Sequence, residues 1–195
     1  MTATNSIAIF GGTFDPIHYG HLHLIDEILN SKKFSKLVIV PAGKPWQKSP
    51  IAPASDRLEM TRRAVGETAT EVSDCEIMRD KPSYAIDTVD ELVSLNPGSS
   101  ISWIIGSDAI PGLSTWKRID EMASKVDFLI VIRPGYEIPQ SAIPTYIKWS
   151  SIEIQELDIS ATQVRERVSA GRDISDLVPA TVAAYIHEKK LYGAA

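Results

Sequence analysis

Two histidines beside a glycine-rich turn are the residues of this 195-residue chain best suited to do chemistry. His18 and His21 follow the segment Ile7-Ala-Ile-Phe-Gly11-Gly12-Thr13-Phe14-Asp15-Pro16, and three of the four histidines lie between positions 18 and 23. An imidazole changes charge close to neutral pH, and its N–H donors can stabilise charge that develops on a phosphoryl oxygen. The clustering therefore predicts a site that handles phosphate groups.

The elements that position this pair are a short buried strand and an amphipathic helix. Residues 7–10 form an apolar run, and apolar residues recur at helical spacing from Leu22 to Leu29. Glycines at 11 and 12 allow a tight turn and a close approach of backbone to ligand, since neither carries a Cβ. The start of a helix at the carboxyl end of a parallel strand favours anions. The turn is thus expected to contact a nucleotide.

The rest of the chain alternates between strand-like and helical patterns, which predicts a single α/β domain over residues 1–195 with a doubly wound, mostly parallel, Rossmann-like sheet. Strands are expected at 7–10, 37–40, 71–77, 101–105 and 128–132, and helices at 22–29, 56–65, 84–95, 162–169 and 179–191. Residues 139–145 are expected to be a loose connection. Glycine, proline or polar clusters follow four strands at 11–16, 41–48, 106–108 and 133–135. Parallel connectivity would bring all four to one edge of the sheet.

Composition excludes several classes of protein. Hydrophobic residues make up 44% of the chain and the net charge is −5, which is typical of a soluble protein and argues against broad nucleic-acid binding. A single cysteine, Cys75, cannot form an intrachain disulfide and suits a reducing cytosol. Residues 1–6 are polar and too short for a signal peptide, and no apolar run approaches a membrane span. We expect a cytoplasmic protein with no nucleic-acid or membrane partner, and a homo-oligomer remains open.

The segment Gly-Gly-Thr-Phe-Asp-Pro-Ile-His-x-Gly-His resembles the signature of the nucleotidylyltransferase superfamily. Its flanking residues are most similar to bacterial nicotinate-nucleotide adenylyltransferases, and the resemblance extends from Ile7 to about Tyr192. It implies a nucleotidylyltransferase fold and adenylyl transfer from ATP to nicotinate mononucleotide. The products would be deamido-NAD and pyrophosphate, in NAD biosynthesis.

The same resemblance implies roles for individual residues on the ATP side. Residues 45–48 match the family's Pro-Pro-His-Lys element with Gln47 in place of its histidine, and residues 159–165 match Ile-Ser-Ser-Thr-x-x-Arg with Ala161 in place of the second serine. The helical part from about 159 to 195 would complete the ATP site. The implied catalytic residues are His18, His21, Lys48 and Arg165, and the implied ATP-binding residues are Gly11, Gly12, Thr13, Phe14, Gly20, Gly106, Asp108, Arg133, Ile159, Ser160 and Thr162.

For the acceptor, the resemblance implies a nicotinate mononucleotide site formed by Lys44, Tyr84, Ala85, Thr88, Trp116 and Lys117. The tryptophan would stack on the pyridine ring, and backbone N–H groups of a helix that starts near Thr115 would bind the carboxylate. Alternatives stay open for three residues. Lys44 could be a solvated lysine, Arg133 a structural ion pair and Thr88 a packed helix residue.

The implied reaction is an in-line attack by the acceptor's 5′-phosphate on the α-phosphorus of ATP. A phosphate monoester is already anionic, so positioning and charge stabilisation suffice and no general base is required. Mg²⁺ is expected as a cofactor carried by ATP, with no metal cage in the protein. The alternatives are another acceptor, nicotinamide mononucleotide or phosphopantetheine, or a nucleotide-binding module without turnover.

Overall fold

A parallel β-sheet forms the centre of the computed structural model, which describes residues 5–46, 49–66, 70–155 and 157–194. Within these ranges the strand order is β3-β2-β1-β4-β5-β6, and every neighbouring pair is parallel. This order confirms the predicted Rossmann-like α/β fold. The strands are β1 (Ser6–Gly12), β2 (Lys36–Pro41), β3 (Thr70–Val72), β4 (Ser100–Gly106), β5 (Asp127–Ile132) and β6 (Trp149–Glu153).

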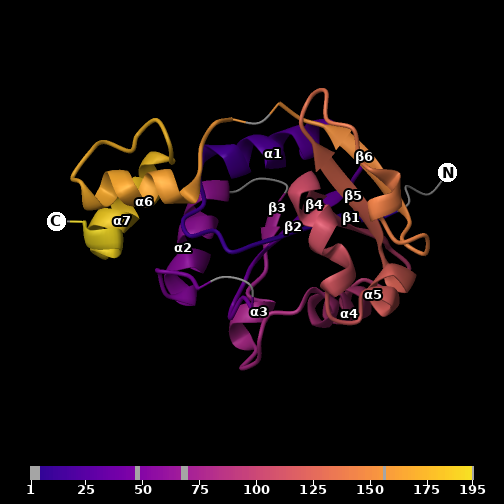
Figure 1. Ribbon diagram of the computed structural model, residues 1–195. Coiled ribbons are helices and arrows are strands. Elements are labelled where there is room, and N and C mark those ends of the chain that lie inside the picture. Colours follow the sequence, from indigo (N-terminus) through magenta and orange to yellow (C-terminus); the bar gives the residue numbers. More distant parts are fainter. Residues whose placement is uncertain (1–4, 47–48, 67–69, 156, 195) are drawn as a thin grey trace.

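Helices cover both faces of the sheet. In Figure 1, α1 lies on one side, and α4 and α5 lie on the other. The α-helices are α1 (Tyr19–Asn30), α2 (Ala54–Val65), α3 (Cys75–Met78), α4 (Ala85–Leu95), α5 (Ile119–Lys125), α6 (Ala161–Ser169) and α7 (Ala180–Glu188). Three 3-10 helices are η1 (Ser107–Thr115), η2 (Gln140–Ala142) and η3 (Leu191–Gly193).

Two hydrophobic clusters hold these layers together, because successive side chains of a strand point to opposite faces. Ala8 of β1 packs with α1, α2, α6 and α7, whereas its neighbours Ile7 and Ile9 pack with α3, α4, α5 and η1. All three side chains are buried. The short apolar runs seen in the sequence are therefore strands buried on both faces, as parallel sheets require.

The C-terminal helices join the first of these clusters. Val164 and Val168 of α6 and Val182 and Ile186 of α7 are buried in the same cluster as Ala8. Figure 1 shows α6 and α7 beside α2, in the yellow end of the chain. Across the described ranges, no helix is both long and apolar enough to cross a membrane.

One local expectation was wrong, and two elements were not predicted. The range 71–77 is not one strand, because β3 ends at Val72 and the short helix α3 follows. Helix α5 was not predicted, and neither was strand β6, which comes after the connection at 139–145. Strand β6 lies at the edge of the sheet, and its residues are exposed or only half-buried. Such a strand carries no apolar run by which it could be found.

Candidate active site

A cavity of about 870 Å³ lies at the carboxyl edge of the sheet, over β1 and β4. These two strands mark the point where the strand order reverses, which is where open α/β sheets bind ligands. Its walls come from both faces of the sheet. The predicted site residues that line it are Gly11, Gly12, Thr13, Phe14, His18, Gly20, His21, Tyr84, Ala85, Gly106, Asp108, Trp116, Lys117, Ile159, Ser160 and Thr162.

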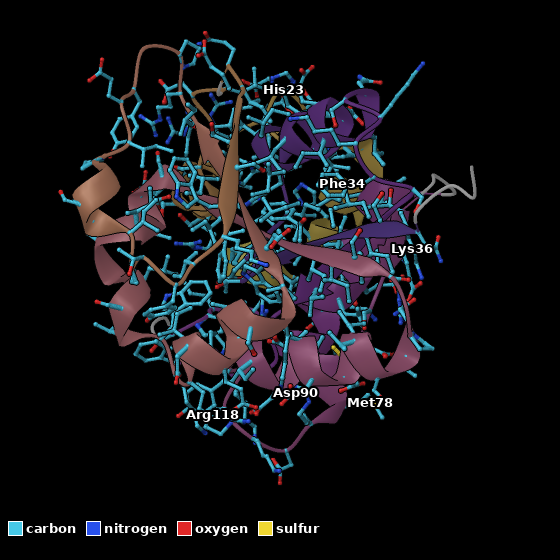
Figure 2. The ribbon with its side chains drawn as sticks, turned by 90° about the vertical axis from the view of Figure 1, so that its right-hand side faces the viewer. His23, Phe34, Lys36, Met78, Asp90 and Arg118 are labelled. Atoms are coloured by element: carbon cyan, nitrogen blue, oxygen red, sulfur yellow. The ribbon has the colours of Figure 1, made fainter. Side chains whose placement is uncertain are left out.

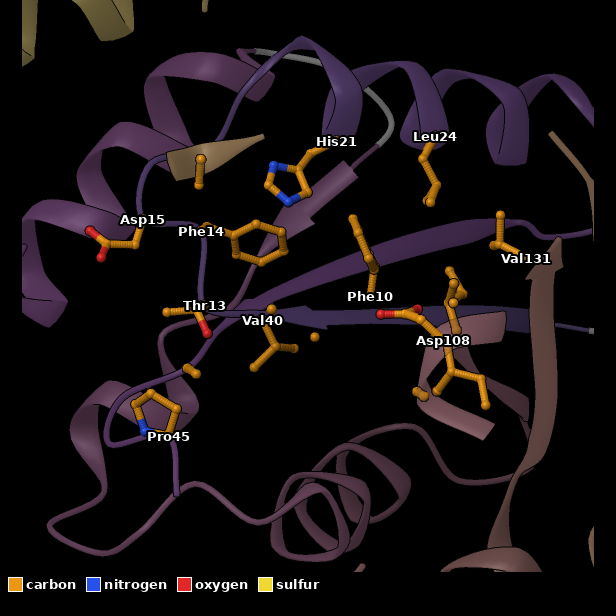
Figure 3. Close-up of a pocket in the computed structure, with 18 of the residues that line it drawn as sticks. Phe10, Thr13, Phe14, Asp15, His21, Leu24, Val40, Pro45, Asp108 and Val131 are labelled. Atoms are coloured by element: carbon orange, nitrogen blue, oxygen red, sulfur yellow. The ribbon is translucent and has the colours of Figure 1, made fainter. Parts of the chain in front are cut away.

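The two histidines stack at the start of α1. Their ring centroids lie 3.7 Å apart, and the backbone N–H of His18 donates to Nδ1 of His21 at 3.3 Å. A neutral His21 whose Nδ1 accepts must carry its proton on Nε2, which makes that atom a donor. The Phe14 ring packs edge-on against His21 at 5.0 Å. Figure 3 shows these two rings next to each other at the cavity.

His18 is the buried member of the pair. It is 6% exposed, and burial lowers its pKa to about 4. Its Nδ1 is buried and has no hydrogen-bond partner among the described residues. The ring is therefore neutral at pH 7, and it can donate or accept a hydrogen bond but cannot supply positive charge.

Glycines in the motif make room for these rings. A Cβ on Gly20 would lie 3.0 Å from Nδ1 of His18, and a Cβ on Gly12 would lie 2.6 Å from the Phe14 ring. At Gly11 the crowding atom belongs to Trp103, at 3.0 Å. The sequence suggested that these glycines admit a nucleotide. The structure adds that the protein's own aromatic side chains already require them.

A second helix start, that of α6, borders the same cavity. Ser160 is its N-cap and accepts from the backbone N–H of Gln163 at 3.2 Å. This geometry settles which of the two expected hydroxyls caps the helix. Since the first turns of α1 and α6 both line the cavity, two positive helix ends meet at one place, and such ends favour phosphate groups.

Two of the three cationic residues predicted for the ATP side, Arg165 and Arg133, lie outside the cavity wall. Arg165 donates to the backbone oxygen of Asp15 at 2.7 Å and to Oγ1 of Thr162 at 3.1 Å, so it stands behind a lining residue. Arg133 follows β5 at the expected edge, but it is exposed and does not line the cavity. Lys48 and its neighbour Gln47 lie outside the described residues.

On the other side of the cavity, Tyr84 and Trp116 supply aromatic surface. Lys117 places its ammonium 4.0 Å from the centroid of the Tyr84 ring, which is a cation–π contact. Trp116 packs edge-on against Trp103 with 6.5 Å between ring centroids. These residues offer a flat ring-binding surface together with a positive charge.

Two residues predicted for the acceptor do not reach the cavity. Thr88 is fully buried. Its hydroxyl donates to Glu76 at 2.6 Å and accepts from Arg79 at 3.2 Å. Lys44 forms an exposed ion pair with Asp80. In this structure Thr88 is thus a packed helix residue and Lys44 an exposed lysine, as the alternatives given for them state.

The helix expected to start near Thr115 is also absent. Thr115 ends η1, and the N–H of Trp116 is already taken by the backbone oxygen of Leu113 at 3.1 Å. Helix α5 starts only after Arg118, whose φ is 52°. The expected contribution of a helix start to carboxylate binding is therefore wrong at this point.

Arg118 instead ties the loop that carries Trp116 to helix α4. It hydrogen-bonds Glu121 at 2.7 Å and lies 3.8 Å from both Asp87 and Asp90 of α4. Figure 2 shows Arg118 and Asp90 close together. Since Tyr84 is the N-cap of the same helix, these ion pairs link the two aromatic walls.

Sequence reasoning missed two charged residues next to the site. Arg57 of α2 is fully buried, and it donates to the backbone oxygens of Thr13 at 2.6 Å and Gly43 at 3.1 Å. Burial lowers its pKa from the usual value for arginine. Glu76, which lines the cavity, stood inside a segment expected to be a strand. Neither residue has a neighbour in sequence that would indicate its role.

The charge of the cavity is mostly negative. Of the lysines and arginines in the described ranges, only Lys117 lines it, together with the acids Asp15, Glu76 and Asp108. An anionic ligand would thus depend on the helix starts, on histidine donors and on ions that accompany it. The described residues contain no group of histidine, cysteine, aspartate or glutamate side chains that could hold a metal ion.

Comparison with known proteins identifies the family of this chain. The sequence model of the cytidylyltransferase-like family matches residues 9–167, which places the chain among α/β nucleotidyltransferases. A protein of Corynebacterium kroppenstedtii named "probable nicotinate-nucleotide adenylyltransferase" is 38% identical over 98% of this chain and 94% of its own. A protein of the same name from Geobacillus thermodenitrificans is 39% identical over 96% of this chain and 86% of its own. The chain belongs to the nicotinate-nucleotide adenylyltransferase family.

A solved structure agrees in fold. The nicotinic acid mononucleotide adenylyltransferase of Plasmodium falciparum, described as complexed with NaAD, superposes with a TM-score of 0.80. It is 24% identical and is matched over 96% of this chain and 97% of its own. At this identity the likeness concerns the fold.

Proposed function

We propose that the protein transfers the adenylyl group of ATP to nicotinate mononucleotide, giving nicotinate adenine dinucleotide and pyrophosphate. One observation carries the proposal. A single cavity spans the β1–β4 edge, with stacked histidines and two helix starts on one side and the Tyr84–Lys117–Trp116 surface on the other. The first side suits a triphosphate, and the second suits a flat ring that carries a carboxylate.

In the proposed reaction, an oxygen of the acceptor's 5′-phosphate attacks the α-phosphorus of ATP. A new P–O bond forms while the bond to the bridging oxygen breaks, and pyrophosphate leaves. No proton has to be removed from the nucleophile, which agrees with a His18 that stays neutral at pH 7. The Nε2–H of His21 donates to a non-bridging oxygen of the α-phosphate, where negative charge grows in the transition state.

The remaining ATP-side residues bind and position in this proposal. The backbone of Gly11, Gly12 and Thr13 and the first turns of α1 and α6 surround the phosphates, with the Thr162 hydroxyl held by Arg165. Lys48 adds a cation by family resemblance. Phe14, Gly20, Gly106, Asp108 and Ile159 complete the ATP side of the wall.

Mg²⁺ fits the proposal as an ion carried by ATP. The described residues offer no donor cluster for it, so phosphate oxygens and water would hold it. When bound, the ion neutralises the triphosphate and stabilises the leaving group. The chain's contribution is the pair of helix starts, which lowers the cost of placing that charge in a mostly acidic cavity.

For the acceptor, the pyridine ring would lie against Trp116, with its carboxylate near the Lys117 ammonium. In this proposal Lys117, and not a helix start, binds the carboxylate. Among the described residues that line the cavity, it is the lysine or arginine present. Glu76 in the same wall accepts from the Thr88 hydroxyl and keeps its negative charge, so the proposal places the ligand carboxylate on the Lys117 side of the wall, away from Glu76. We further propose that the protein acts in the cytoplasm on these small molecules.

The test is pyrophosphate release from ATP and Mg²⁺ with purified protein and each acceptor in turn. Nicotinate mononucleotide should give the fastest release, together with the dinucleotide product. Faster turnover with nicotinamide mononucleotide or phosphopantetheine would assign a different acceptor. ATP binding without release from any acceptor would make the chain a binding module.

A further inference from the structure

The turn after β1 is held from behind by a buried carboxylate. Asp15 is 6% exposed, and its two oxygens accept from the backbone N–H groups of Ile51 at 2.7 Å and Ala52 at 3.1 Å. In Figure 3 this carboxylate points away from the His21 ring. Asp15 therefore connects the turn to the segment before α2, on the side opposite the histidines.

A residue near the other end of the chain completes this arrangement. The hydroxyl of Tyr192, in η3, donates to Oδ1 of Asp15 at 2.8 Å, across 177 positions of sequence. Burial and this hydrogen bond raise the pKa of Tyr192 well above that of an ordinary tyrosine, so the hydroxyl stays a donor. Tyr192 has a φ of 57°, a conformation that a residue with a side chain keeps only where its surroundings hold it.

The same turn receives two further long-range contacts. Arg57 donates to the backbone oxygen of Thr13, and Arg165 donates to that of Asp15. Phe14 lies between Thr13 and Asp15 in the chain. It has a φ of 49° and packs against the ring of His21. The position of the turn therefore sets the position of Phe14, and Phe14 limits where the His21 ring can lie.

We propose that Tyr192 is a positioning residue for adenylyl transfer, which acts through Asp15 to fix the turn at 13–15 and, through Phe14, the His21 ring. Tyr192 does not itself line the cavity, although its partner Asp15 does. The inference rests on the proposed function, because it concerns the geometry of that reaction. A displacement of about 1 Å at reacting groups can cost on the order of 10² in rate, since alignment is a large part of catalysis.

Tyr192→Phe tests this with a matched control, Tyr185→Phe. The Tyr185 hydroxyl also donates to an aspartate, Asp56, at 2.8 Å, but on α7 and away from the turn. Each variant loses one hydroxyl with the same kind of partner at the same distance. Tyr192→Phe should lower kcat by about tenfold with a smaller change in the KM for ATP, whereas Tyr185→Phe should stay within about twofold of wild type.

A second measurement does not depend on activity. Amide hydrogen exchange of residues 11–16 should be faster in Tyr192→Phe than in wild type, and unchanged in Tyr185→Phe. A double-mutant cycle tests whether the effect passes through Asp15. In an Asp15→Ala background, Tyr192→Phe should lower kcat by less than about twofold.

The outcomes separate the two proposals. A wild-type protein without pyrophosphate release would contradict the proposed function, and the exchange measurement would still decide whether Tyr192 holds the turn. An active wild type, with equal kcat and equal exchange in the two tyrosine variants, would overturn the inference. A full tenfold loss from Tyr192→Phe in the Asp15→Ala background would also overturn it.

Discussion

His21 supplies the donor on which the proposed transfer depends most, since its Nδ1 is occupied by the His18 N–H and its Nε2 carries the proton. His21→Ala should reduce kcat by on the order of 10²–10³ and leave ATP affinity within a fewfold of wild type. His187→Ala, an exposed histidine in the last turn of α7, is the matched control. Steady-state kinetics beside ATP-analogue binding would measure both quantities, and near-normal turnover of a folded His21→Ala protein would contradict the role.

His18 should make the protein less stable as the pH falls. Because burial lowers its folded-state pKa to about 4 from 6.5, the unfolded chain binds the proton first. Stability linked to His18 is therefore complete above pH 6.5 and is lost between pH 6.5 and 4. The loss from pH 7 to 4.5 is roughly 2–3 kcal/mol.

Urea unfolding of wild type and His18→Asn at pH 7 and 4.5 measures this contribution. Groups common to both proteins cancel in the comparison, so the variant should lose less stability than wild type over this range. An equal loss in the two proteins would show that His18 titrates normally.

Some roles of single residues could be predicted from the sequence, and others depend on distant contacts. His18, His21 and Ser160 line the cavity at helix starts, as their motifs indicated, because such positions are set by the sequence next to each helix. The buried role of Arg57 was not predictable, since an arginine beside acidic residues on an amphipathic helix usually faces solvent. Thr88 shares the limitation, because Glu76, which accepts from its hydroxyl, comes from a segment that the sequence assigned to a strand, and Arg79 follows just after that segment.

At the scale of elements, the first turn of α1 has little space for added volume beside the His18 ring. Gly20→Ala should favour the helix by up to about 1 kcal/mol through propensity alone. Its Cβ would, however, lie 3.0 Å from the His18 ring and 3.5 Å from the backbone oxygen of Ile159. We expect kcat to fall at least about tenfold while thermal stability changes little. A variant that is more stable and fully active would show that the contact relaxes at no cost.

The elements that the sequence predicted are those with a strong apolar pattern. Strands β1, β2, β4 and β5 are buried on both faces and were found, together with their common edge. Helix α5 has seven residues and follows a left-handed Arg118, so neither its length nor its cap gives a signal. Strand β6 pairs with β5 along its whole length, but this pairing is long-range and leaves no mark on its own sequence.

At the scale of the whole molecule, the strand order explains why one cavity can hold two substrates. β1 lies between β2 and β4, so the chain leaves the sheet in opposite directions on either side of this point. Helices α1 and α6 approach the cavity from one face, and η1 and α4 approach from the other. Residues from both faces of the sheet therefore line the same cavity. An in-line attack then requires that the acceptor's phosphate oxygen lie opposite the leaving pyrophosphate oxygen on the α-phosphorus.

The choice of acceptor tests the proposed function most directly. With ATP and Mg²⁺ fixed, kcat/KM is measured for nicotinate and nicotinamide mononucleotides, which differ in a carboxylate and a neutral amide. The positive charge of Lys117 beside the Tyr84 and Trp116 rings predicts that the nicotinate form is favoured at least about tenfold, since a charge-assisted contact exceeds a neutral one by about 1 kcal/mol or more. Equal values, or a preference for the amide, would contradict the account.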